Sequence, residues 1–370
     1  MGAAYIGRIY SGSWGDGRCT GAPHVSVTLE QESGTTTMAN FSVVPGAAVS
    51  EILSDSHKDV LRIIAETYVA HEQGQSVNPD SYFLRFPDKP NARVIALPSY
   101  LGGNVDTIGM KWIASFPDNI RHGLPRASAT LLLNDYATGY PLACLEAASI
   151  SAARTAASAA VAAAELLGSE EPVRVSFIGA GVIARTILDY LAAHGIRIAE
   201  VLVHDLDAVS AGHLGAHATG RLGVPVTSGS LDEALTRDLV VFATTAATPY
   251  VSGDTPLRAG QVILNVSLRD LAPELLLKTN NVVDDIDHCL KAQTSPHLTE
   301  QLTGGRDFIN GTLGALLQGE VALDPARATV FSPFGLGILD LAVGHHILAE
   351  ARHRGTAVDI PDFIGETTRW

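Results

Sequence analysis

Residues 173–194 constrain the fold more than any other part of the chain. The apolar run 173–178 is typical of a buried strand, a Gly-Ala-Gly turn follows at once, and residues 182–194 have helical spacing. In the pattern G-x-G-x-x-A, Gly179 permits a tight turn, Gly181 lets the backbone approach a pyrophosphate, and the small Ala184 lets helix and strand pack closely. The segment predicts a dinucleotide site, although an ordinary α/β protein can also contain such a turn.

Strand and helix patterns alternate after this turn. We expect a helix at 208–222 and strands at 200–204, 224–226, 239–243, 261–266 and 282–284. This alternation predicts an α/β fold, with a Rossmann-type, doubly wound parallel sheet in a domain that spans residues 168–334. Ligands of such sheets bind beyond the carboxyl ends of the strands, so the residues at those ends are candidate cofactor contacts.

A carboxylate lies where dinucleotide-binding sheets usually have one. Asp205 ends the second strand, 24 residues after Gly181, about where a carboxylate binds the adenosine ribose hydroxyls. It would repel a 2′-phosphate, so we expect NAD rather than NADP; a solvated strand-end carboxylate is the alternative. The predicted cofactor contacts are Gly179, Gly181, Val182, Ile183, Asp205, Thr244, Thr245 and Ser267. The hydroxyl residues at the later strand ends have turn formation as their alternative role.

The residues before this domain follow another pattern. Short apolar runs are separated by Pro, Gly and Asn, which predicts an antiparallel sheet. The runs lie at 93–97, 108–114 and 129–133. Helix patterns at 54–74 and 145–167 flank them, so we expect an α+β domain over residues 41–167 that binds substrate.

The two ends of the chain have different expected roles. Residues 1–40 are rich in Gly, Ser and Thr without a period, so we expect a leader outside any core, with Met38 as a plausible natural start. Residues 335–370 contain a long helix that is apolar at one end. We expect this helix to complete the domain formed by residues 41–167.

Charge and cysteine content disfavour several classes of protein. Asp and Glu outnumber Lys and Arg by 39 to 25, and the net charge of −14 argues against nucleic acid or an anionic membrane as a partner. Hydrophobic residues make up 46% and charged residues 17% of the chain, which excludes intrinsic disorder. The 3 cysteines have neither a disulfide framework nor a metal-ligand spacing. We therefore expect a cytoplasmic protein without a bound metal.

Charged residues in apolar segments are the candidates for chemistry. Lys111 lies in an apolar strand and Arg154 in an alanine-rich helix, where a cation is costly unless it is paired or functional. The alternatives are a lysine that reaches solvent from the sheet and an arginine in an internal salt bridge. Asp270 follows strand 261–266, at the edge where a substrate would meet a nicotinamide ring.

Several long strings of residues resemble one family. GMKW at 109–112, TGYP at 138–141, RTAA at 154–157 and the glycine turn occur in the order typical of that family. From about residue 41 to 354, the chain resembles the ornithine cyclodeaminase/μ-crystallin family. The strings KWIASFPDN, GLPRASA and LNDYATGYPLACLE, which begin at residues 111, 123 and 133, resemble the branch that makes 2,3-diaminopropionate for siderophores or antibiotics.

The resemblance implies an NAD(P)-dependent enzyme acting on an amino acid. Arg85 and Arg154 would bind the α-carboxylate, Lys111 would polarise that carboxylate or carry a proton, and Asp270 would be the acid–base group. Further candidates for carboxylate binding, with an ordinary loop role as the alternative, are Arg126 and Arg269. The resemblance also implies a homodimer formed through the sheet of the substrate domain.

One stretch departs from the cyclodeaminases. They carry Gly-Gly-Asp-x-Pro-Gly-Lys-Thr-Glu-Leu around the acid–base aspartate, whereas residues 266–274 are VSLRDLAPE. This difference disfavours ornithine cyclisation and favours NAD-dependent oxidation of a secondary amine with three carboxylates. Ornithine cyclodeamination, another amino-acid or imine oxidoreduction, and non-catalytic binding of NAD(P)H or a small molecule are the alternatives. Retention of Lys111, Arg154 and Asp270 argues against the last.

Overall fold

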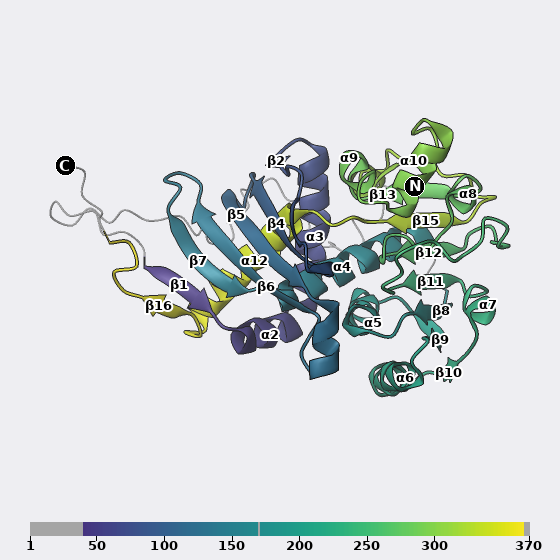
Figure 1. Cartoon of the computed structure of the whole chain (residues 1–370), viewed down its shortest axis with the longest axis horizontal. Coiled ribbons are helices and arrows are strands. Elements are labelled where there is room, and N and C mark those ends of the chain that lie inside the picture. Colours follow the sequence, from purple (N-terminus) through teal and green to yellow (C-terminus); the bar gives the residue numbers. More distant parts are fainter. Residues whose placement is uncertain (1–39, 169–170, 366–370) are drawn as a thin grey trace, which may run out of the picture. The chain divides into compact units, whose positions relative to one another are not determined.

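The chain folds into two compact units, which are described separately. The structure is a computed structural model that describes residues 40–168 and 171–365 (Figure 1). Within the described residues, unit 1 comprises His57–Glu72 and 152–336, and unit 2 comprises 40–56, Gln73–Ser151 and 337–365. The expected leader, apart from residue 40, lies outside the described residues.

This division differs from the predicted boundary between residues 167 and 168. Helix α3 (His57–Glu72) and most of α4 (Ala148–Leu167) belong to unit 1. The physical reason is long-range packing, because α3 buries an apolar stripe and contacts α5 (Val182–His194) and α11 (Leu313–Leu317) of the same unit.

Unit 1 is built on a parallel sheet of eight strands, which confirms the predicted α/β fold class. The spatial order is β10-β9-β8-β11-β12-β15-β13-β14, and all the pairs are parallel. The strands are β8 (Val173–Ile178), β9 (Ile198–His204), β10 (Val226–Ser228), β11 (Leu239–Phe242), β12 (Val262–Asn265), β13 (Asn280–Val283), β14 (Gly311–Thr312) and β15 (Thr329–Ser332). The further helices are α6 (Ala208–Leu222), α7 (Leu231–Ala234), α8 (Pro273–Leu276), α9 (Ile286–Cys289) and α10 (Ser295–Thr303).

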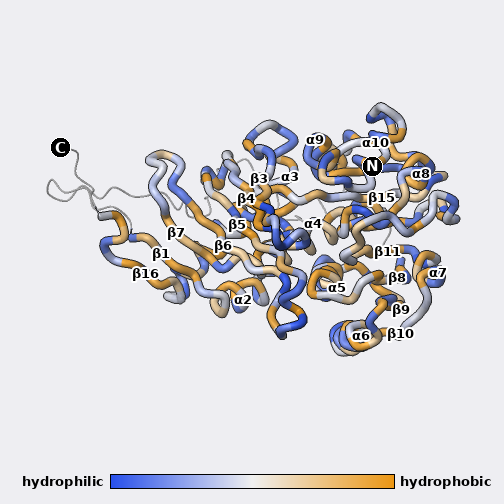
Figure 2. Tube along the Cα trace, viewed as in Figure 1, coloured by the Kyte–Doolittle hydropathy of each residue, from blue (hydrophilic) through white to orange (hydrophobic). Residues whose placement is uncertain are grey.

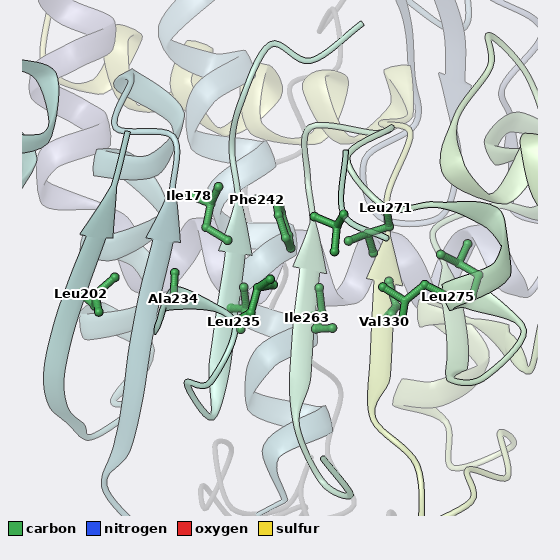
Figure 3. Close-up of a cluster of buried hydrophobic side chains, with 12 residues drawn as sticks. Ile178, Leu202, Ala234, Leu235, Phe242, Ile263, Leu271, Leu275 and Val330 are labelled. Carbon is green, nitrogen blue, oxygen red and sulfur yellow. The ribbon is translucent and has the colours of Figure 1, made fainter. Parts of the chain in front are cut away.

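One face of this sheet is covered by a buried apolar cluster. Phe242, Ile263 and Val330 point to the same side from neighbouring strands, and Leu235 and Leu275 pack over them (Figure 3). The central strands are hydrophobic along their length, as expected for a parallel sheet with both faces covered (Figure 2). Each fully buried side chain of this size stabilises the fold by about 1.5–3 kcal/mol. The strand ends that carry the candidate site therefore rest on a rigid core.

Unit 2 is built on a second sheet of eight strands, in the order β16-β1-β7-β6-β5-β4-β2 with β3 paired to β4. All its pairs are antiparallel except β1–β7. The strands are β1 (Phe41–Val44), β2 (Ser76–Val77), β3 (Tyr82–Phe86), β4 (Lys89–Leu101), β5 (Thr107–Ser115), β6 (Ala127–Asp135), β7 (Pro141–Glu146) and β16 (Val358–Ile360). The helical elements are α2 (Gly46–Asp55), a 3-10 turn (Pro117–His122) and α12 (Gly337–His353).

The two faces of the unit 2 sheet differ. Helix α12 packs on β4, β5 and β6, and Cβ atoms built on Gly109 and Gly337 would lie within 3 Å of side chains across this contact. Side chains alternate between the faces, so Trp112 and Leu132 point away from α12 and are 42% and 36% exposed. The sheet thus has one covered face and one open apolar face.

Helix α4 has the length and hydropathy of a membrane span, but 67% of its most apolar window is buried. A mostly buried helix of this kind is typical of a protein core.

Candidate functional site

The glycine turn after β8 leaves space for a ligand. Gly179 has φ +93°, and a Cβ there would lie 2.5 Å from the carbonyl oxygen of Ala243, so a side chain is excluded. Gly181 is the N-cap of α5, where no side-chain cap bonds the free N–H groups, and a Cβ there would meet nothing within 4 Å. Exposed backbone N–H groups at the start of a helix suit the phosphates of a dinucleotide.

Asp205 is held at this turn by the backbone. Its Oδ2 accepts a hydrogen bond from the N–H of Ala180 at 2.7 Å, and its Oδ1 accepts one from the N–H of Asp207 at 2.8 Å. Each carboxylate oxygen has a second lone pair, so the group can still accept hydroxyl protons. Leu206, next to it, is fully exposed at 100%. The sequence-predicted ribose contact therefore has a fixed orientation next to an exposed leucine.

A pocket of about 230 Å³ lies beyond the carboxyl ends of the unit 1 strands. Four predicted residues line it: Arg154 from α4, Ile183 from α5, Thr244 after β11 and Ser267 after β12. The segment Pro333–Gly335 after β15 completes its wall. Of the other predicted cofactor residues, Val182 is 57% exposed and Thr245 is also exposed, and neither lines the pocket. The structure thus brings a cation and two hydroxyl groups together at the expected sheet edge.

Asp270 does not line the pocket but lies directly behind it. Its side chain is 0% exposed, and Ser267 donates a hydrogen bond to Oδ2 at 2.5 Å. Thr244 and Tyr250 donate to Oδ1, the latter at 2.9 Å. Burial and the negative charge of Asp270 raise the pKa of Tyr250, which keeps its phenol protonated and available as a donor. Three hydroxyl groups thus donate hydrogen bonds to this buried carboxylate.

Arg154 is confined by the segment that follows β15. A Cβ built on Gly335 would lie 2.4 Å from Nη1 of Arg154, and Gly335 has φ +98°. The N–H of Gly335 donates to Oδ2 of Asp284 at 2.6 Å, and burial raises the pKa of that carboxyl. The close approach of this glycine therefore fixes where the guanidinium lies in the pocket.

Lys111 lies in unit 2 and makes a buried ion pair. Its Nζ is 2.6 Å from Oδ2 of Asp340 on α12 and donates to Oγ of Ser151 at 3.2 Å. The side chains of Lys111 and Asp340 are 2% and 0% exposed. Asp340 was missed by the sequence analysis, although a single carboxylate in the apolar stretch GILDLAVG was a usable signal.

The three remaining predicted arginines have different surroundings. Arg85 is exposed on β3, with its guanidinium 5.4 Å from the centre of the Phe83 ring. Arg126 in unit 2 is half-buried, which lowers its pKa, and its Nε donates to Oγ of Ser115 at 3.3 Å. Arg269 in unit 1 donates to the carbonyl oxygen of Ala292 at 3.0 Å, and like Asp270 it is outside the pocket lining.

The described residues contain no group of three or more His, Cys, Asp or Glu side chains that could hold a metal ion. The polar groups of the site instead form an anion-binding turn, a ribose-type carboxylate and a pocket with a cation. These features define an α/β protein with a dinucleotide site of the Rossmann type.

The chain belongs to the ornithine cyclodeaminase/mu-crystallin family, whose sequence model matches residues 45–355, and this confirms the predicted resemblance. It is 28% identical over 311 residues to N-((2S)-2-amino-2-carboxyethyl)-L-glutamate dehydrogenase of Staphylococcus aureus, a match that covers 80% of this chain and 92% of that one.

Two solved structures are also similar. Delta(1)-pyrroline-2-carboxylate reductase of Thermococcus litoralis, in complex with NADH and L-proline, has a TM-score of 0.79 at 26% identity, covering 86% of this chain and 100% of that one. An archaeal alanine dehydrogenase dimer with bound NAD has a TM-score of 0.78 at 25% identity, covering 88% and 100%.

Proposed function

We propose that this protein is an NAD-dependent amino-acid dehydrogenase that oxidises N-(2-amino-2-carboxyethyl)-L-glutamate to 2,3-diaminopropionate and 2-oxoglutarate. NAD dependence is supported by the glycine turn, by Asp205 and by the relatives solved with NADH or NAD. The substrate assignment is supported by the Staphylococcus aureus relative and by a group of arginines in unit 2.

This arginine row, defined as Arg85, Arg93 and Arg126, is the observation that carries the substrate assignment. Arg85 on β3 lies directly opposite Arg93 on β4, and Arg93 lies opposite Ser115 on β5, which receives the hydrogen bond from Arg126. Like charges on opposed residues repel each other. Among the described residues, Arg85 and Arg126 make no ion pair, although the chain as a whole carries a charge of −14. A ligand with several carboxylates could pair with Arg85 and Arg126.

The arginine row shares a sheet face with Lys111. Residues 93, 95 and 97 of β4 oppose 115, 113 and 111 of β5, and alternate residues of a strand point to the same side. Arg85, Arg93, Ser115 and Lys111 therefore lie on the face that α12 partly covers. The substrate has three carboxylates, and a row of cations along one face matches that charge.

Arg154, Lys111 and Asp270 have different proposed roles in the oxidation of the amine. The nicotinamide, when bound, accepts a hydride from the Cα of the glutamyl part. Arg154 binds the adjacent α-carboxylate, Lys111 binds and polarises a carboxylate, and the amine proton is removed toward Asp270. Oxidation gives an imine, and addition of water releases 2-oxoglutarate and 2,3-diaminopropionate. Ornithine has one carboxylate and a second ammonium, which the arginine row would repel.

A pair of incubations tests the substrate. With N-(2-amino-2-carboxyethyl)-L-glutamate and NAD⁺, we expect NADH absorbance to rise and 2-oxoglutarate to appear in the mass spectrum. With L-ornithine we expect neither proline nor ammonia. Arg126→Gln should raise KM for the tricarboxylate by about tenfold, because a charge-assisted hydrogen bond contributes about 1.5–3 kcal/mol. Formation of proline from ornithine would favour a cyclodeaminase. If neither substrate gives a product although NADH binds, a binding protein or another imine substrate would be favoured.

Cofactor preference depends on Asp205. We expect NADH to bind at least about tenfold more tightly than NADPH, because the fixed carboxylate accepts ribose hydroxyls and repels a 2′-phosphate. Asp205→Ser should lower the preference for NADH over NADPH, mainly by weakening the binding of NADH. Fluorescence titration of both nucleotides measures the ratio, with the exposed Asp254→Asn as control. Equal affinities in the wild-type protein would contradict the assignment.

Displacing Arg154 without removing it should impair substrate binding. Gly335→Ala places a methyl group where Nη1 of Arg154 lies, so we expect the amino-acid KM to rise by about tenfold or more. Gly304→Ala is the matched control, because Gly304 also has positive φ, at +72°, but a Cβ there meets nothing within 4 Å. Both variants should lose similar stability from backbone strain, about 1 kcal/mol. Equal KM values in the two would show that Arg154 does not contact substrate.

We also propose a cytoplasmic homodimer formed through the open face of the unit 2 sheet. Tyr82, Ala96, Trp112 and Thr130 lie in one cross-strand row on that face, and Tyr82 is 68% exposed. The alanine dehydrogenase relative is a dimer. Exposed aromatic side chains on a flat sheet are typical of a contact between copies. Sedimentation of Trp112→Glu tests the dimer; an unchanged sedimentation coefficient would place the interface elsewhere.

A further inference from the structure

We propose that Ser267 is a catalytic residue that passes the substrate's amine proton to Asp270, and that Tyr250 is a positioning residue for this relay. The proposal rests on the proposed function, because it deepens how the unit 1 pocket removes a proton during amine oxidation. It follows from where the hydroxyl groups stand between the pocket and the buried carboxylate.

Asp270 cannot contact a ligand of the pocket directly. Its side chain is 0% exposed and is absent from the pocket lining, whereas Ser267 and Thr244, which bond it, both line the pocket. A base must come within hydrogen-bond reach of the proton that it removes, directly or through one intermediary. In this fold the intermediary is a hydroxyl group of the protein.

The two hydroxyl groups differ in the hydrogen bonds that their oxygens already make. The oxygen of Thr244 already accepts a hydrogen bond from the N–H of Ala246 at 3.2 Å while it donates to Asp270. Ser267 makes one side-chain hydrogen bond within the described residues, the one that it donates to Asp270. A hydroxyl group has two acceptor lone pairs, so Ser267 can accept a substrate N–H while it donates its own proton.

The loop geometry fixes Ser267 for this role. The N–H of Ser267 donates to the carbonyl oxygen of Phe242 at 3.1 Å, and the next residue, Leu268, has φ +81°, which is strained for a leucine. The carbonyl oxygen of Leu268 accepts from the N–H of Ser295 at 2.7 Å, which holds the strained loop in place. Strain that the surroundings maintain is often found where a side chain must be aimed.

Tyr250 completes the set of groups around Asp270. Its hydroxyl donates to Oδ1, and the N–H groups of Tyr250 and Val251 donate to the carbonyl oxygen of Asp270, each at 3.0 Å. The charged group nearest in sequence, Arg269, donates instead to Ala292, and no cation within the described residues pairs with Asp270. Within the described residues, the side-chain groups that hold the carboxylate of Asp270 in place are therefore hydroxyl donors.

In the relay, the amine proton reaches Asp270 through two proton transfers. As the hydride leaves the substrate Cα for NAD⁺, the N–H proton passes to Oγ of Ser267, and the Ser267 hydroxyl proton passes to Oδ2 of Asp270. The electron pair of the N–H bond becomes the second bond of the imine. During hydrolysis water adds to the imine carbon and supplies the carbonyl oxygen of 2-oxoglutarate. Asp270 returns its proton through Ser267 to the nitrogen that leaves as the amine of 2,3-diaminopropionate, one water proton follows to the same nitrogen, and the other is released to solvent.

Ser267→Ala tests the relay, with Ser267→Thr as the conservative rescue. We expect Ser267→Ala to lower kcat by about 10²-fold or more, the usual scale for a lost proton-transfer group, with little change in the Kd for NADH. Ser267→Thr keeps the hydroxyl group and should stay within about tenfold of wild type. Tyr250→Phe should lower kcat by about tenfold with little change in KM, because one hydrogen bond that positions the carboxylate is lost.

The matched control is Ser295→Ala. Ser295 is buried and, like Ser267, donates a hydrogen bond near the loop, to the carbonyl oxygen of Leu271 at 2.8 Å, but it makes no hydrogen bond to Asp270. We expect it to lose stability while its kcat stays within about tenfold of the wild type. A fall in kcat as large as that of Ser267→Ala would attribute the Ser267 effect to loop disruption and overturn the relay.

A binding measurement separates the relay from the proposed function. In the presence of NADH, which prevents oxidation, we titrate N-(2-amino-2-carboxyethyl)-L-glutamate, L-alanine and L-proline by fluorescence. Loss of the acceptor in Ser267→Ala should raise the Kd of the ligand that binds by about tenfold, and Ser267→Thr should not. Equal binding and turnover in Ser267→Ala would overturn the relay alone. If the Kd for NADH of Ser267→Ala rises as its kcat falls, Ser267 is a cofactor contact and the relay is overturned. If none of the three ligands binds to the wild-type protein, both proposals are overturned.

Discussion

Asp270→Asn should lower turnover by about 10²–10⁴-fold while NADH binding remains close to that of the wild type and unfolding remains cooperative. The amide has nearly the shape of the carboxylate, so the buried volume is kept. It cannot take up a proton at neutral pH, so the amine proton has no acceptor during oxidation. Two of the surrounding donors, Ser267 and Tyr250, are hydroxyl groups that can rotate to accept from the new amide.

The rotation of these hydroxyls limits the cost in stability. We expect the free energy of unfolding to fall by about 1–3 kcal/mol, the range for an imperfectly satisfied buried polar group. Stopped-flow measurement of NADH formation and urea denaturation give the two quantities, with Asp254→Asn, 97% exposed in the same unit, as the control. Near-normal turnover of Asp270→Asn would move the base elsewhere, and Lys111 would be the next candidate.

The first half of the Rossmann sheet could be predicted because its signals are local. Strand 173–178 and helices 182–194 and 208–222 were predicted with the bounds that the structure has. The apolar run, the glycine turn and the helical spacing are all within one short stretch, so no distant contact is needed to interpret them. The third strand, predicted at 224–226, lies instead at Val226–Ser228, a shift typical of a short edge strand.

In the second half the expected strands 239–243, 261–266 and 282–284 are present as β11, β12 and β13, but their order could not be predicted, because it depends on long-range pairing. Strand β15 comes late in the chain but lies between β12 and β13, and its four residues, TVFS, give no period of their own. Helix α2 was also missed, since the pattern predicted one helix over 54–74 and Ser56 instead separates α2 from α3. The break follows from packing, because α2 contacts α12 in unit 2 whereas α3 packs in unit 1.

The candidate site was predicted in part for the same reason. Residues at strand ends, such as Thr244 and Ser267, were identifiable because parallel strands place their carboxyl ends at one edge. Tyr250 and Arg93 were not, because their importance comes from a hydrogen bond and a cross-strand pairing that the sequence does not state. The burial of Asp270 behind the pocket could likewise not be predicted from sequence pattern and spacing.

Lys111→Met should lower the free energy of unfolding by about 3–5 kcal/mol, because it removes the ammonium from a carboxylate that is 0% exposed. Lys278→Met is the control: Lys278 pairs with Asp254 at 3.2 Å, but their side chains are 57% and 97% exposed, so the expected loss is at most about 1 kcal/mol. Urea denaturation measures both. A loss of stability alone, however, would not distinguish a catalytic lysine from a structural one.

The double variant Lys111→Met/Asp340→Leu makes that distinction. Replacing both members of a buried ion pair by apolar side chains of similar size often restores stability, so we expect most of the lost free energy of unfolding to return. Activity should not return, because the proposed role of Lys111 is to bind and polarise a substrate carboxylate, which methionine cannot do. We therefore expect kcat/KM of the stable double variant to remain about 10²-fold or more below wild type. If turnover returns together with stability, the ion pair serves only the fold of unit 2, and the carboxylates of the substrate are held by the arginine row and Arg154 without Lys111.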